Sequence, residues 1–113
     1  MNQLSISYTL HPQGQNYDLV KSFIDLISTT YAHLDESQYV IRTPFSPILV
    51  EMLLSAVIDA NDGYAVLSVA GIRTNWKLEW RPGLQASARG KLESRRMIQE
   101  LRLRALRLRA RCA

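Results

Sequence analysis

The sequence predicts a small α+β domain in which two helices cover one face of an antiparallel sheet. Residues 4–10 alternate like a strand, residues 17–30 have helical spacing, and residues 31–43 resemble a β-hairpin. A second helix and strand pattern then follows. With 113 residues, the chain has the length of one domain with one two-layer core.

The first strand is predicted from the segment LSISYTL, where apolar and hydroxyl side chains alternate. This period of two is typical of a strand with one buried face. The hydroxyl residues expected on the face opposite the helices are Ser5, Ser7 and Thr9. We therefore expect that face to be polar or to hold a partner.

The sequence then predicts two helices and three further strands. A loop precedes an amphipathic helix at 17–30, and the turn at 35–37 joins short strands near 31–34 and 38–43. Ser46 as N-cap and Pro47 at the first helical position predict a helix over 47–60, and the segment YAVLSVAG predicts the next strand. This order is that of the ferredoxin-like βαββαβ fold.

One more strand is predicted from the alternation of Trp76, Leu78 and Trp80 with charged residues, and it ends before Gly83. Edge strands of small sheets need pairing or cover. We therefore expect these three side chains to lie near the subunit contact of a homodimer. Residues 1–82 would form the ferredoxin-like domain, 83–90 a linker, and 91–113 an arginine-rich C-terminal helix.

The tail from residue 89 is predicted to be a helix to about residue 110 rather than a strand. Leu101 and Leu103 share one parity but Leu106 and Leu108 have the other, so a strand would change faces between them. Alanine, leucine and arginine also rank high in helix propensity. Apolar residues form one broad stripe and a second, smaller one between the arginines.

Charge is divided unevenly along the chain. Residues 1–88 carry five basic and eight acidic side chains, a net charge of −3, whereas residues 89–113 carry nine and two, a net charge of +7. The predicted nucleic-acid-binding residues are Arg95, Arg96, Arg102, Arg104, Arg107, Arg109 and Arg111. Two other interpretations stay open, a docked helix with solvated arginines and a helix that binds an acidic protein partner.

Several functional classes are disfavoured. The single cysteine, Cys112, excludes an internal disulfide, and the two histidines, His11 and His33, form no metal-ligand cluster with recognisable spacing. No apolar run approaches the ~18 residues of a membrane span, and no signal-peptide pattern opens the chain. We expect a cytoplasmic protein without a membrane partner.

Three segments resemble a known family: SYTLHPQGQNYDLVKSFIDLI, HLDESQYVIRTPFS and NDGYAVLSVAG. They are similar to the SinR-like group of the CRISPR-associated small adaptation-protein superfamily, which also includes the ribonuclease GhoS and the toxin VapD. The resemblance covers about residues 4–76. It implies a ferredoxin-like dimer that acts as a metal-dependent endoribonuclease or DNase, or as a non-catalytic scaffold or inhibitor in CRISPR, toxin–antitoxin or phage systems.

The resemblance also places a candidate catalytic site at the end of the first strand. Nuclease relatives have a carboxylate after the tyrosine there, which holds a divalent metal such as Mg²⁺ between subunits. In this chain the position is Thr9, a poor ligand for a hard cation, so the sequence departs from the family pattern at its metal-binding position. The nearby His11 is either a metal-free general base or an ordinary loop residue.

Overall fold

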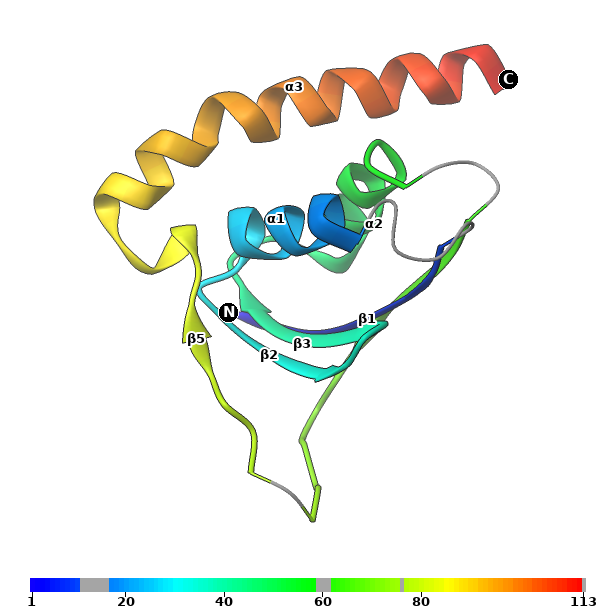
Figure 1. The fold of residues 1–113 in the computed structure, drawn as a ribbon. Coiled ribbons are helices and arrows are strands. Elements are labelled where there is room, and N and C mark those ends of the chain that lie inside the picture. Colours follow the sequence, from blue (N-terminus) through cyan, green and yellow to red (C-terminus); the bar gives the residue numbers. More distant parts are fainter. Residues whose placement is uncertain (11–16, 59–61, 76, 113) are drawn as a thin grey trace.

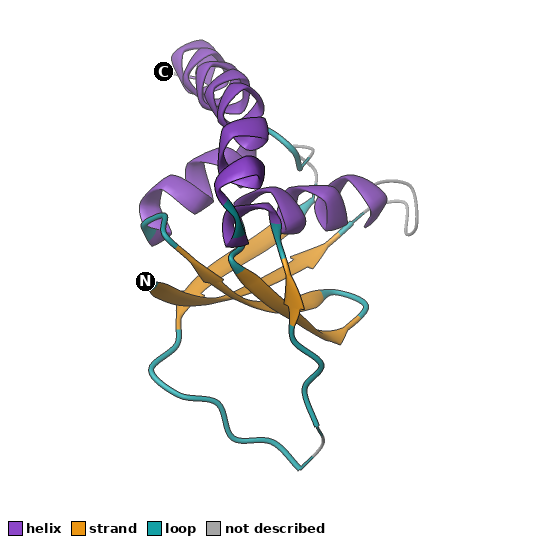
Figure 2. Cartoon of the chain, turned by 90° about the vertical axis from the view of Figure 1, so that its left-hand side faces the viewer, coloured by secondary structure: helices purple, strands orange, loops and turns teal. Residues whose placement is uncertain are grey.

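The computed structural model describes residues 1–10, 17–58, 62–75 and 77–112. Five antiparallel strands form one sheet in the order β4-β1-β3-β2-β5, and the helices lie on one face of it (Figures 1 and 2). The elements are β1 (Asn2–Thr9), α1 (Tyr17–Ile27), β2 (Thr30–Asp35), β3 (Gln38–Thr43), α2 (Pro47–Ser55), β4 (Gly63–Ser68), β5 (Arg81–Pro82), a 3₁₀ helix η1 (Leu84–Ala86) and α3 (Ala88–Cys112). The predicted ferredoxin-like fold with an extra strand and a C-terminal helix is confirmed.

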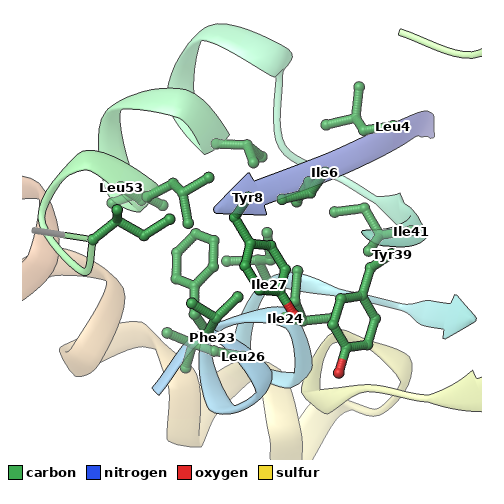
Figure 3. Close-up of a cluster of buried hydrophobic side chains, with 14 of the residues drawn as sticks. Leu4, Ile6, Tyr8, Phe23, Ile24, Leu26, Ile27, Tyr39, Ile41 and Leu53 are labelled. Carbon is green, nitrogen blue, oxygen red and sulfur yellow. The ribbon is translucent and has the colours of Figure 1, made fainter. Parts of the chain in front are cut away.

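The core lies between the sheet and the two helices α1 and α2. Leu4, Ile6 and Tyr8 of β1 are at most 4% exposed, and they contribute to a cluster with side chains of both helices (Figure 3). The register places Ile6 opposite Tyr39 of β3 and Val66 of β4. The alternation in the sequence therefore correctly predicts which face of β1 is buried.

The far face of the sheet, opposite the helices, is less exposed to solvent than its serine and threonine residues predict. Ser5 is only 6% exposed, and its hydroxyl oxygen accepts a hydrogen bond of 3.1 Å from Nε2 of Gln38. Its register neighbour Val40 is also buried on this face. The face is therefore mixed in character rather than uniformly polar.

Both helices end earlier than the apolar spacing predicts. Helix α1 ends at Ile27 rather than residue 30, because Ser28 turns its hydroxyl back to the carbonyl of Ile24 and β2 begins at Thr30. Helix α2 begins as predicted, with Oγ of Ser46 accepting from the backbone of Leu49 at 3.2 Å. It ends at Ser55, and residues 59 and 60 of the predicted helix lie outside the described residues.

The extra strand is shorter than predicted and begins only after Trp80. Residues 77–80 have no regular secondary structure, and Trp76 lies outside the described residues. Only Arg81–Pro82 pairs as a strand, and it pairs with β2 at the edge opposite β4. The ring of Trp80 instead lies over the Arg42 guanidinium at 4.1 Å, a cation–π contact that needs no strand pairing.

Residues 83–90, expected as a linker, contain η1 and the first residues of α3. The backbone amides of Gly83 and Gln85 donate to the carbonyls of Thr29 and Ser28, each at 3.0 Å. Gly83 comes so close to the end of α1 that an added Cβ would overlap the carbonyl oxygen of Ser28. This segment is therefore packed against the domain.

The close approach at Gly83 makes a prediction about stability. Gly83→Ala should lower the free energy of unfolding by about 1–3 kcal/mol, because the new methyl group has no space beside Ser28. Gly71→Ala is the matched control, since nothing lies within 4 Å of its added Cβ. Urea unfolding followed by tryptophan fluorescence measures both variants. Equal stability of the two would contradict the packing described for residue 83.

Candidate nucleic-acid interface

Helix α3 crosses the outer side of the helical layer, away from the sheet (Figure 1). Its inward face is small and weakly apolar: Ser94 and Ala105 are 1% and 0% exposed, while Ile98 and Leu101 are half-buried against the core. The remaining faces of the helix point to solvent. The helix is thus docked along one stripe and open along the others.

A buried glutamine fixes the start of α3. Nε2 of Gln85 donates to the carbonyl of Leu26 at 2.9 Å and to Oγ of Ser94 at 2.7 Å, so it joins η1, α1 and α3. Since Gln85 is only 5% exposed, losing these partners would leave a buried amide unsatisfied. The amide therefore determines where the helix leaves the domain.

A second anchor holds the C-terminal half of α3. Glu51 of α2 accepts hydrogen bonds from the Tyr64 hydroxyl and from the Arg109 guanidinium, each at 2.7 Å. The Tyr64 hydrogen bond, and then Arg109, hold the pKa of Glu51 below its ordinary value. Burial, together with the Glu51 carboxylate, raises the pKa of Tyr64 to about 12. The Glu51 carboxylate is thus kept charged where it meets the helix.

The predicted arginines all lie on the exposed surface of α3. Arg96 pairs with Glu100 at 3.2 Å and Arg109 with Glu51, but both pairs are partly solvated. Of the seven predicted arginines, Arg95, Arg102, Arg104, Arg107 and Arg111 have no ion pair within the described parts of the chain. Their charge is therefore available to an anionic ligand.

A second apolar stripe also faces solvent on α3. Leu92, Leu103 and Leu106 are 66%, 46% and 47% exposed. The helix thus presents leucines interleaved with arginines on the side away from the domain. This arrangement matches the two stripes read from the sequence.

The residues that hold α3 were not predicted. Gln85 has no sequence signal, because a polar residue in a short segment rich in small residues is ordinary. Glu51 has one: it is the only charged residue in the otherwise apolar helix PILVEMLLS. A single carboxylate in such a helix indicates a specific partner, which here is the pair Tyr64 and Arg109.

The predicted catalytic position has no charged metal ligand among the described residues. Thr9 is exposed at the end of β1 and pairs with Gly63, and His11 lies outside the described residues. No group of three histidine, cysteine, aspartate or glutamate residues that could hold a metal ion occurs in the described ranges. The donors at Thr9 therefore do not fit Mg²⁺ as the resemblance requires.

The predicted dimer-contact residues Leu78 and Trp80 are half-buried in the segment before β5. They line one cavity together with Gln3 of β1 and Arg42 of β3. Among the described helices, none is long and apolar enough to cross a membrane.

Comparisons with models of known protein families, with curated proteins and with solved structures find no match for this chain. The family resemblance therefore stays a prediction.

The second anchor leads to a prediction about pH. Tyr64→Phe removes the main cause of the lowered Glu51 pKa, so this pKa should rise toward its ordinary value. A lowered folded-state pKa adds stability above the unfolded pKa, and this stability is lost as pH falls through the folded pKa. The variant should thus lose about 1 kcal/mol at pH 7, and the difference should narrow at pH 3.

Carboxyl NMR titration and urea unfolding at both pH values measure these effects. Tyr31→Phe is the control, because the Tyr31 hydroxyl makes no hydrogen bond within the described residues. An unchanged Glu51 titration in Tyr64→Phe would show that the hydroxyl does not set this pKa.

Proposed function

We propose that the protein binds nucleic acid, RNA or DNA, through the outer face of α3. The observation that carries the proposal is the set of exposed arginines on this helix that have no carboxylate partner among the described residues. Arginine on an exposed helix is suited to phosphate oxygens, because its guanidinium group donates paired hydrogen bonds.

The distribution of charge supports this choice of ligand. The net charge of +7 in residues 89–113 stands against −3 in the rest of the chain, so positive potential is concentrated on one element. Helix α3 has 25 residues, which gives a length of about 37 Å. This length is similar to one turn of duplex, about 34 Å, so the helix is long enough to reach several phosphates.

The contact offered by α3 is independent of base sequence. Residues 88–112 include no aromatic side chain that could stack on a base. Phosphate contacts alone position a nucleic acid but do not read its sequence. We therefore propose backbone recognition with a strong dependence on salt.

Nuclease activity is expected from the family resemblance alone. The proposal includes no metal-dependent step, because Thr9 replaces the expected carboxylate and no group of three metal-ligating side chains occurs among the described residues. A degenerate endoribonuclease that keeps only nucleic-acid binding is consistent with these residues. Incubation of the pure protein with RNA and DNA in Mg²⁺ or Mn²⁺ tests for remaining activity.

We also infer that the chain forms a homodimer through the outer edge of β4. This strand ends the sheet, and β1 is its one neighbour among the described strands. Leu67, on the far face of β4, is 58% exposed. An uncovered edge strand with an exposed leucine favours pairing with a second copy. Leu67→Lys should shift sedimentation equilibrium from dimer to monomer, and a wild-type monomer at high concentration would refute the inference.

The binding proposal predicts how charge-removing variants behave. Replacing Arg102, Arg104 and Arg107 by glutamine should weaken binding to labelled RNA and duplex DNA and lower the salt slope by about two to three. The matched control is the variant with lysine at the same three positions, because lysine keeps the positive charge on the exposed surface. Fluorescence anisotropy at several salt concentrations measures both.

If the glutamine variant binds as tightly as the wild type, α3 is not the nucleic-acid interface.

A second candidate function, a non-catalytic scaffold or inhibitor that binds an acidic protein helix, is favoured by the exposed Leu92, Leu103 and Leu106. Absence of nucleic-acid binding in both variants and wild type would leave this second candidate.

A further inference from the structure

A pocket lined by aromatic side chains lies between the start of α1 and the β2–β3 hairpin. It encloses about 450 Å³, within the range of small-molecule sites. Its lining residues are Tyr8, Tyr17, Asp18, Lys21, His33, Glu36 and Tyr39. This pocket is separate from α3, which packs along the other flank of α1 near Leu19 and Leu26.

Three of the rings form a continuous stack. His33 lies parallel to Tyr39, with 4.3 Å between ring centroids and 6° between the planes. Tyr39 lies nearly parallel to Tyr8, at 6.4 Å and 17°. One face of His33 is covered by Tyr39, and because His33 is exposed, a planar ligand can extend the stack from its other face.

The base of this stack is held rigidly by the core. Tyr8 and Tyr39 are 4% and 3% exposed and belong to the hydrophobic cluster (Figure 3). The Tyr8 hydroxyl donates to the carbonyl of Glu36 at 2.8 Å. Burial raises the pKa of both tyrosines, so both stay neutral. The pocket therefore needs little ordering when a ligand enters.

A second cavity of about 420 Å³ adjoins the first and shares Lys21, His33 and Tyr39 with it. It adds two cations, Lys77 and Arg81, and one carboxylate, Glu79. The first cavity instead has two carboxylates, Asp18 and Glu36, beside its single lysine. The combined site is thus aromatic and acidic at one end and basic at the other.

None of these charged groups forms an ion pair with another described residue. A ligand that matches both ends carries a planar group with N–H donors and, a few ångströms away, an anionic group. A nucleotide has this combination, because its base stacks and donates hydrogen bonds while its phosphate is negative. Guanine is the best match, since two neighbouring N–H donors can meet one carboxylate.

We propose that the paired cavities bind a guanine nucleotide. The base extends the stack from His33 and donates to Asp18 or Glu36, and the phosphate lies against Lys21, Lys77 and Arg81. This site differs from the arginine face of α3 in ligand and location. It does not depend on nucleic-acid binding by α3.

Titration calorimetry of the full chain with GMP, UMP and guanosine tests the site. GMP should bind more tightly than UMP, which lacks the paired donors. His33→Ala should weaken GMP by about tenfold or more, because base stacking is lost. Lys21→Ala should weaken GMP about fivefold while leaving guanosine unchanged, because the lost contact is to phosphate.

Lys91→Ala is the matched control for Lys21→Ala, because Lys91 is an exposed lysine on α3. It should leave GMP affinity unchanged, as should the glutamine variant of Arg102, Arg104 and Arg107. All substituted side chains are exposed, and near-ultraviolet circular dichroism checks that each variant is folded. No GMP binding by the wild-type chain, equal affinity for GMP and UMP, or unchanged affinity in His33→Ala would overturn the proposal.

Discussion

The close approach of residues 83–85 to the end of α1 is the constraint on which the surrounding structure depends. After β4, the chain passes to the opposite edge of the sheet, pairs briefly with β2 and must then return to the helical side. Backbone hydrogen bonds from Gly83 and Gln85 to Thr29 and Ser28 direct this return. They place Arg81 beside the aromatic pocket and set the point from which α3 crosses the helices.

The docking of α3 is a compromise between burial and charge. A helix with nine basic side chains from residue 89 onward cannot bury much of its surface, because each unpaired buried cation would be costly. The chain therefore buries a narrow stripe around Ala105 and supplies one carboxylate, Glu51, to Arg109. The other arginines keep their solvation, which leaves them able to exchange water and counterions for phosphate.

Sequence patterns predicted the fold correctly in elements where burial of one face makes apolar residues recur at a regular spacing. The alternation in β1 and the cap at Ser46 follow directly from local physics, and the structure confirms both. The spacing of Trp76, Leu78 and Trp80 imitates a strand, but Trp80 meets Arg42 of β3, a partner 38 positions earlier that no local period encodes. The aromatic pocket was missed for the same reason: its rings come from separate elements, and a register shift after His33 determines which of them stack.

The two proposed sites divide the tasks of recognition between them. The arginine face of α3 has charge but no rings, so it can hold a phosphate backbone without distinguishing bases. The pocket beside His33 has rings and carboxylates but only a few cations at one end, so it can distinguish a base yet holds only one phosphate group. Because they occupy opposite flanks of α1, a single nucleotide cannot engage both. Salt should therefore weaken the α3 contact much more steeply than the pocket, since counterion release scales with the number of phosphates bound.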